Sequence, residues 1–186
     1  MKFVGACEYD GSSFSGFQSQ KNAQSVQGTL EKAISSVGRL TNTINYSGRT
    51  DAGVHSSYFC AHFDYNQIIN DKSNFIYKSN SFLPKDISIS RIYKVKDDFH
   101  ARFDALSRTY QYKINTFKNP FLIKSSYYLR KDINFHKMNL AALKLYNYKN
   151  FRLCNSCQFT SKYTDPSTRE LRSQLATEGG LSVFEM

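Results

Sequence analysis

The chain has 186 residues, which leaves room for one domain or two small, closely packed halves and excludes a large multidomain machine. Apolar residues make up 40% of the chain and charged residues 22%, so a packed core is expected and general disorder is not. The formal net charge of +10 favours polyanionic partners, such as nucleic acid or an acidic membrane surface.

The first part of the chain predicts a complete alternation of strands and helices. Apolar residues recur at helical spacing over 26–37, with Ser25 as the N-cap and Gly38 after the end. Ser73 is expected to cap a second helix, which ends before Pro84. Strands are predicted at 3–9, 44–47, 58–63 and 87–95. This β-α-β-β-α-β order predicts an α+β fold with a ferredoxin-like (split βαβ) antiparallel sheet and both helices on one side.

A partial second α+β half is expected to follow. Its predicted elements are strands at 107–115 and 127–129 and a helix over 135–145. The periodicity fades after Cys157, and we expect 165–186 to be a poorly ordered tail. The predicted organisation is an N-terminal half at 1–105, a strongly basic partial half at 106–164 and this tail.

The positive charge is concentrated in one segment. Residues 107–164 hold 11 basic side chains against the carboxylate of Asp132 alone, whereas residues 1–106 hold 12 basic and 10 acidic side chains. Tyrosines are interleaved with the cations, so phosphate contacts and base stacking could combine on one surface. A lysine-rich surface that is merely well solvated is the alternative, and we favour the phosphate-binding surface.

A polar turn between the second and third predicted strands carries a single carboxylate. Gly48 and Gly53 bracket Asp51, so the backbone can turn tightly and present the carboxylate at the end of the sheet. Arg49 is close enough in sequence to keep that carboxylate ionised. The alternative is a structural pair of Arg49 and Asp51 in a hairpin-like loop, and spacing alone leaves both interpretations open.

A second cluster combines a cation with two aromatic rings. Period-two alternation places Arg108, Tyr110 and Tyr112 on one face of the predicted strand at 107–115. A cation beside an aromatic ring on an open sheet suits a nucleotide. Ordinary cross-strand packing explains the same pattern equally well.

The sequence does not support a metal site, a Ser-His-Asp catalytic triad or a nucleotide-cofactor site. Cys154 and Cys157 form one Cys-x-x-Cys pair without the further ligands that a structural zinc needs, so no metal is expected. The four histidines are dispersed, and neither a dinucleotide fingerprint nor a Walker lysine is present. Without an export signal or an apolar run of about 18 residues, we expect a cytoplasmic protein that keeps its thiols and does not bind membranes.

Six short motifs follow one another along residues 1 to about 150. They are Tyr9-Asp10-Gly11 with Phe14-x-Gly16-Phe17-Gln18, Ser25-Val26-Gln27, Gly48 to His55, Asn80-Ser81-Phe82-Leu83-Pro84, His100-Ala101-Arg102-Phe103 and Ser107 to Tyr112. Together they resemble the tRNA pseudouridine synthase A family, whose members isomerise uridines at positions 38 to 40 of the tRNA anticodon stem-loop. The Arg-Thr-Asp-Ala-Gly-Val-His element is the most specific, and beside the downstream Ser-Arg-Thr-Tyr it favours a catalytic Asp51.

The resemblance implies roles for individual residues. Asp51 would be the catalytic nucleophile, Arg49 its companion and Tyr110 the contact to the target base. Further RNA contacts are expected from Arg108, Arg102, His55 and Lys113. The resemblance also implies a homodimer with tRNA as its partner. No cofactor is expected, because the reaction gains and loses no atoms.

The sequence departs from the family in its later part. Family members are longer and have two ferredoxin-like halves, and their later strands have no counterpart after about residue 150. We therefore expect a shortened member, acting either as a working isomerase or as a non-catalytic RNA-binding remnant. Phe17 also stands where the family often has Trp. An RRM-like module shares the predicted topology, but the aromatic RNP segment that it requires is missing.

Overall fold

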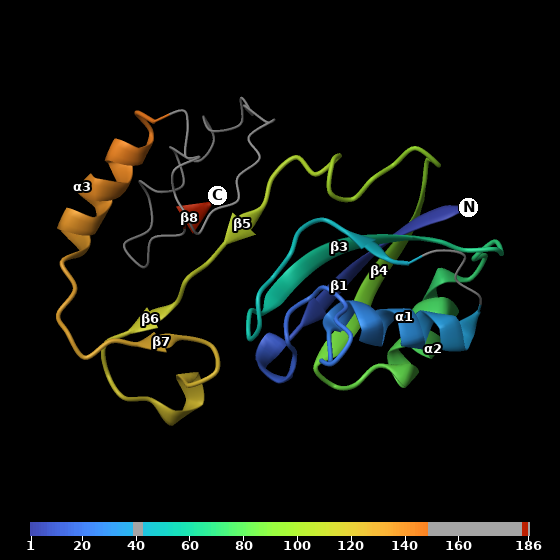
Figure 1. The fold of residues 1–186 in the computed structure, drawn as a ribbon, viewed down its shortest axis with the longest axis horizontal. Coiled ribbons are helices and arrows are strands. Elements are labelled where there is room, and N and C mark those ends of the chain that lie inside the picture. The colour runs from blue at the N-terminus through green and yellow to red at the C-terminus, as the bar shows by residue number, and fades with distance from the viewer. Residues whose placement is uncertain (39–42, 149–183, 186) are drawn as a thin grey trace. The chain divides into compact units, whose positions relative to one another are not determined.

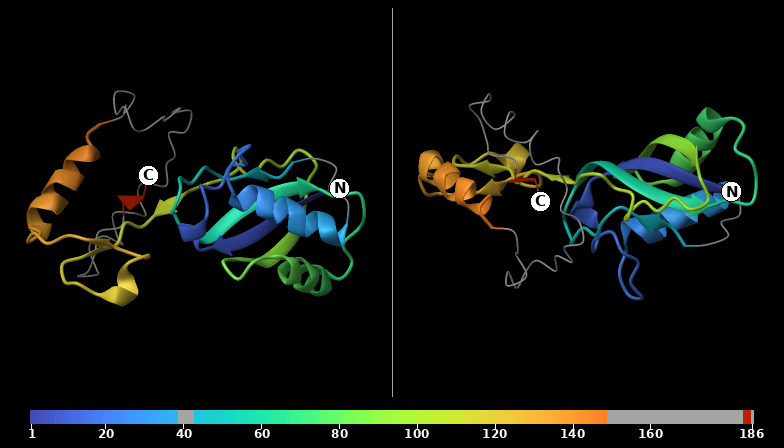
Figure 2. Two further views of the ribbon diagram at one scale, coloured as in Figure 1. Left: turned by 60° about the horizontal axis from the view of Figure 1, so that its bottom comes forward. Right: turned by 90° about the horizontal axis from the view of Figure 1, so that it is seen from above.

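The computed structural model describes residues 1–38, 43–148 and 184–185. Contacts divide the chain into two units, Met1–Ala105 and Leu106–Met186, and Figures 1 and 2 show the elements of each. Among the described residues, no helix combines the length and the apolar character that crossing a membrane requires. The Cys154–Cys157 pair and most of the predicted tail lie outside the described residues.

The first unit is built on a four-stranded antiparallel sheet. Its strands are β1 (Lys2–Tyr9), β2 (Asn45–Tyr46), β3 (Ser56–Asp64) and β4 (Ile87–Val95). They lie in the order β2-β3-β1-β4, so the first strand is central and the last is an edge. The helices α1 (Val26–Val37) and α2 (Lys72–Phe82) cover one face of this sheet (Figure 1). The prediction of an α+β unit with an antiparallel sheet is therefore confirmed.

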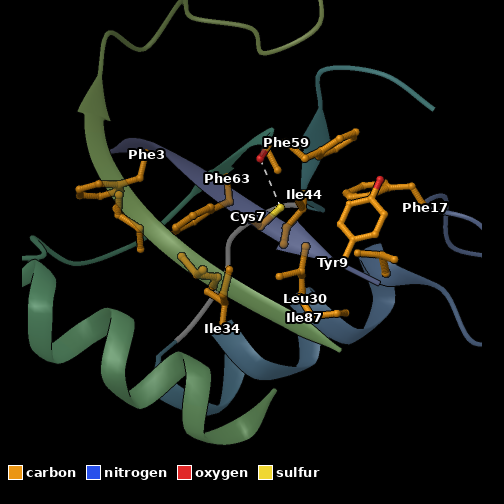
Figure 3. Packing of buried hydrophobic residues seen from close by; sticks show 14 of the residues in the cluster. Phe3, Cys7, Tyr9, Phe17, Leu30, Ile34, Ile44, Phe59, Phe63 and Ile87 are labelled. Atoms are coloured by element: carbon orange, nitrogen blue, oxygen red, sulfur yellow. Dashed lines mark hydrogen bonds between the residues drawn. The ribbon is translucent and has the colours of Figure 1, made fainter. Parts of the chain in front are cut away.

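The core lies between the sheet and the two helices. Alternate residues of β1 face it, and Figure 3 shows Phe3, Cys7 and Tyr9 with the core residues of α1 and β3. Burial raises the pKa of Cys7 to about 12, so this thiol stays protonated at neutral pH. Cys7 and Cys60 are both free thiols, as the sequence predicted for them.

Local signals set the bounds of α1. The Ser25 hydroxyl accepts a hydrogen bond from the Gly28 amide at 3.2 Å, and Gly38 follows the last helical residue, so both predicted ends are confirmed. Gln27 is buried, and its side chain joins the Ser19 amide to the Ile44 carbonyl. The Ser25-Val26-Gln27 motif therefore serves the fold of this unit.

The predicted cap of α2 is wrong. Asp71, not Ser73, is the N-cap, and its carboxylate accepts from the Asn74 amide at 2.9 Å. Aspartate and serine are both good caps, and the prediction placed the helix start two residues too late. The predicted end of the helix is confirmed, because α2 stops at Phe82, before Pro84.

Strand β4 does not alternate regularly. A register shift relative to β1 falls between Ile89 and Arg91, so that Ile92 is buried and Arg91 is exposed. Asn80 hydrogen-bonds the outward backbone groups of Ile89, with its Oδ1 2.8 Å from the Ile89 nitrogen and its Nδ2 3.0 Å from the Ile89 oxygen. Asn80 thus replaces the missing neighbour of an edge strand.

A turn after β4 is fixed to the open face of the sheet by His62. The Ala101 amide donates to His62 Nδ1 at 3.0 Å, and the ring of His100 lies 4.8 Å from that of His62. Both Ala101 and His62 are buried, each 2% exposed. The His100-Ala101-Arg102-Phe103 motif therefore closes the first unit against its own sheet.

The burial of His62 predicts an acid-sensitive fold. Burial first, and then the charges of His100 and Lys2, lower the pKa of His62 from 6.5 to about 4. An unfolded histidine binds its proton at a higher pH than this buried one, so His62 contributes stability above about pH 6.5 and loses it as the pH falls toward 4.

We test this with His62→Asn, which keeps a hydrogen-bond acceptor for Ala101. Urea unfolding gives the free energy of unfolding of the wild type and of the variant at each pH. The stability of the wild type relative to the variant should be about 2 to 3 kcal/mol lower at pH 4 than at pH 7. A constant difference for His62→Asn would contradict the assignment.

The second unit consists of short elements. They are β5 (Thr109–Tyr110), β6 (Ile114–Asn115), β7 (Tyr127–Tyr128), β8 (Phe184–Glu185), the 3-10 turn η2 (Pro120–Leu122) and the helix α3 (Phe135–Leu145). β5 pairs with β8 antiparallel, and β6 pairs with β7 parallel. The continuous strand predicted over 107–115 is therefore wrong, because residues 111–113 join two strands that have different partners.

Candidate active site

The loop between β2 and β3 presents Asp51 at the end of the sheet. The Ser47 amide donates to the Cys60 carbonyl at 2.9 Å where the loop begins. Near its end, the Val54 amide donates to the Asp51 carbonyl at 3.3 Å, which closes a tight turn around the carboxylate residue. Asp51 is exposed, so its side chain is accessible to a substrate.

The segment between β1 and α1 supports this loop from one side. The Phe17 amide donates to the Thr50 carbonyl at 3.0 Å, and the Gly53 amide donates to the Phe14 carbonyl at 3.4 Å. Gly16 has a φ of +90°, and a Cβ on it would lie 2.7 Å from the Thr50 oxygen. Only glycine permits both this conformation and this approach. The Phe14-x-Gly16-Phe17 motif is therefore the support of the Asp51 loop.

Side chains add two further anchors to the loop. The Tyr9 hydroxyl lies 2.9 Å from Thr50 Oγ1. At the far end, His55 Nδ1 lies 3.0 Å from Asp10 Oδ1 and 3.3 Å from the Gly11 nitrogen. The Gly11 amide donates to His55 Nδ1, and the Asp10 carboxylate lies beside the same ring nitrogen, so His55 joins the end of the loop to the segment after β1.

Arg49 and Asp51 do not form the structural pair that spacing left open. Both side chains are exposed, and no ion pair within 4.0 Å joins them. Within the part of the chain that the structure describes, the Asp51 carboxylate has no hydrogen-bond partner either. A carboxylate that is exposed on a well-anchored loop and does not serve the fold is available for chemistry.

The other predicted site residues are divided between the two units. Arg102 is exposed in the turn after β4, with its guanidinium carbon 5.9 Å from the centre of the Phe103 ring. Tyr110 lies in β5 of the second unit and is 41% exposed. Arg108 and Tyr112 lie outside β5 and β6, so the prediction of one strand face for Arg108, Tyr110 and Tyr112 is wrong.

The tyrosines and Lys113 of the second unit have their own surroundings. The rings of Tyr112 and Tyr127 lie 6.4 Å apart, and both are more than half exposed. Lys113 is exposed, and its backbone carbonyl accepts from the Tyr127 amide at 2.8 Å. Over the described residues, no three His, Cys, Asp or Glu side chains are grouped so that they could hold a metal ion.

The sequence interpretation missed the individual roles of Tyr9, Asp10 and Thr50. All three belong to quoted motifs, so a signal was present. Their contacts join segments about 40 residues apart, with Tyr9 and Thr50 separated by 41 positions. Motif spacing along one segment cannot reveal a partner in another.

Comparisons with known proteins show the family of the chain. The model of the tRNA pseudouridine synthase family matches residues 6–104. The chain is similar to a tRNA pseudouridine synthase A of Bacteroides fragilis, with 42% identity over 160 residues, covering 86% of this chain and 62% of the relative. It is also similar to the tRNA pseudouridine synthase A of Bacteroides thetaiotaomicron, with 41% identity, covering 86% of this chain and 57% of that one.

A third relative is covered more fully. The tRNA pseudouridine synthase A of Parabacteroides distasonis shares 39% identity over 179 residues, covering 95% of this chain and 69% of the relative. The chain thus spans between 57% and 69% of the length of these three relatives. The Asp51 loop and the segment that supports it both lie within the residues that the family model matches.

Proposed function

The chain belongs to the tRNA pseudouridine synthase family, and we propose from this that it isomerises uridine to pseudouridine in tRNA. The observation that carries the proposal is the Asp51 carboxylate, exposed on a loop anchored at both ends. We propose the anticodon stem-loop, at positions 38 to 40, as the target, and the cytoplasm as the location.

The proposed reaction moves one glycosidic bond. The bond from N1 to C1′ breaks, the base turns, and C5 bonds to C1′, while C5 loses a proton and N1 gains one. Asp51 is the proposed nucleophile, and its carboxylate adds either to the uracil ring or to C1′ as positive charge develops there. Since no atom or electron is gained or lost overall, the proposed reaction uses no metal and no nucleotide cofactor.

Arg49 and Tyr110 have proposed roles in substrate binding. A uridine in a stem must leave the stack before it can react. Arg49 is exposed beside Asp51, so its side chain can fill the space that the base leaves. Tyr110, 41% exposed, is the proposed platform for the base. Further RNA contacts are proposed for Arg102, Arg108, Lys113 and His55.

We also propose that the chain is organised in two halves. The strand order β2-β3-β1-β4, with both helices on one face, supports a ferredoxin-like first half at 1–105. A partial second half at 106–164, a tail at 165–186 and a homodimer complete the proposed organisation. The 11 basic residues at 107–164 support the RNA-binding part of the proposal.

The same basic segment favours a second candidate, an RNA-binding protein without catalysis. Release of tritium from tRNA labelled at uridine C5 separates the two, because isomerisation must expel that hydrogen. Release in proportion to enzyme and time is expected from the isomerase. Retained label together with intact tRNA binding would support the binding protein instead.

A further inference from the structure

The Asp51 carboxylate must be held by its backbone. It has no hydrogen bond or ion pair with any other described side chain, and its own side chain is exposed. Its position relative to a bound base therefore depends on the residues on either side. A displacement of about 1 Å at a reacting group can cost on the order of a hundredfold in rate.

Thr50, the residue before Asp51, is held from several directions. Its carbonyl accepts from the Phe17 amide at 3.0 Å, and its Oγ1 lies 2.9 Å from the Tyr9 hydroxyl. Gly16 lies so close to the Thr50 oxygen that a side chain there would collide with it. Of these contacts, the one from Tyr9 is made by a side chain that is anchored in the core.

The ring of Tyr9 is rigidly placed. It belongs to the central strand β1, is 4% exposed and lies edge-on to Phe59 at 5.7 Å between ring centres. The Phe17 ring lies 6.0 Å away on another side, and Figure 3 shows Tyr9 and Phe17 next to each other at one end of the core. The hydroxyl is thus a fixed point for the loop, because packing leaves the ring few alternative rotamers.

We propose that Tyr9 is a positioning residue, whose hydroxyl holds Thr50 and thereby sets the place of the Asp51 carboxylate. The proposal rests on the proposed function for its catalytic consequence and on the Tyr9–Thr50 contact for its geometry. Tyr9 acts through Thr50, so its loss should lower the rate of the chemical step while leaving tRNA affinity unchanged. A residue needed only for folding would affect both, together with stability.

The test compares Tyr9→Phe with Tyr65→Phe in the full chain. Tyr65 is also 4% exposed in the same core but lies against Phe3 and Phe75, so its variant is the matched control. Thr50→Val removes the partner hydroxyl, and Thr50→Ser retains it. We expect Tyr9→Phe and Thr50→Val to lower the single-turnover rate of tritium release roughly 10- to 100-fold, with tRNA affinity within about twofold. Thr50→Ser and Tyr65→Phe should keep rates near that of the wild type.

Amide hydrogen exchange of the free protein gives a readout that does not need activity. The reporters are the amides of Phe17, Gly53 and Val54, each of which donates a hydrogen bond that holds the Asp51 loop. The Ser47 amide is the internal reference. Tyr9→Phe should speed exchange at the three reporters roughly fivefold and leave Ser47 unchanged. Unchanged reporters, or the same change in Tyr65→Phe, would overturn the proposal.

The two readouts separate the failure of this proposal from failure of the proposed function. If the wild type releases no tritium while the reporters respond to Tyr9→Phe, the proposed function is wrong but the geometric claim is supported. If tritium is released and Tyr9→Phe matches the wild type in rate, Tyr9 does not position the nucleophile. A fall in affinity equal to the fall in rate would also overturn the positioning role.

Discussion

Replacing Asp51 with Asn is expected to lower the rate of uridine isomerisation at least about a thousandfold, since removal of a nucleophile leaves only the contributions of binding. Asn keeps the size of the side chain and removes its charge and nucleophilic oxygen. Because Asp51 is exposed and bonds to no other described side chain, the free energy of unfolding should change by less than about 0.5 kcal/mol. Single-turnover tritium release measures the change in rate, and urea unfolding measures the change in stability.

The control is Asp97→Asn in the turn after β4. Asp97 is another exposed carboxylate of the same unit, and only its backbone carbonyl is engaged, by Lys2 Nζ at 2.7 Å. This variant has the same change of net charge and should release tritium at the rate of the wild type. Equal rates for Asp51→Asn and Asp97→Asn would remove Asp51 from the mechanism.

Replacing Phe17 with Ala is expected to cost about 3 to 5 kcal/mol of unfolding free energy. The Phe17 ring is 0% exposed, stacks on Phe59 at 4.4 Å between ring centres and lies 4.7 Å from the Tyr46 ring. Truncation leaves a cavity among the rings of Tyr9, Tyr46 and Phe59. The loss is a large fraction of the roughly 5 to 15 kcal/mol that stabilises an ordinary domain.

Urea unfolding followed by circular dichroism measures this loss. Phe82→Ala is the matched control, because Phe82 at the end of α2 is 58% exposed. Its expected cost is below about 1 kcal/mol. If Phe17→Ala costs no more than Phe82→Ala, the Phe17 ring does not contribute to the core as described.

Much of the first unit could be predicted because its signals are local. The apolar spacing of α1, the Ser25 cap and Gly38 lie within 14 consecutive residues, and each is confirmed. The cap of α2 was predicted wrongly at Ser73, because aspartate and serine are both good caps and Asp71 takes this place. The irregularity at Ile89 depends on the partner strand β1, so periodicity within β4 could not reveal it.

The candidate site also combines local features, which the sequence shows, with contacts between distant segments, which it does not show. The two glycines mark the turn that holds Asp51, but only the resemblance of the Arg-Thr-Asp-Ala-Gly-Val-His element to the family favoured a catalytic role for it. The contacts from Tyr9 and Asp10 to that turn join distant segments, so only the folded chain reveals them. In the second unit, the alternation around Tyr110 predicted one continuous strand. Tyr110 instead pairs with Phe184, whereas Ile114 pairs with Tyr127, so the segment forms two strands.

The most direct test of the account is to map pseudouridine in tRNA after incubation with the wild-type chain. Carbodiimide adducts at pseudouridine stop a reverse transcriptase, so each modified position yields a defined product. The account predicts new stops at one or more of positions 38 to 40, absent when Asp51→Asn replaces the wild type. An unmodified anticodon stem-loop in tRNA that the chain demonstrably binds would contradict it.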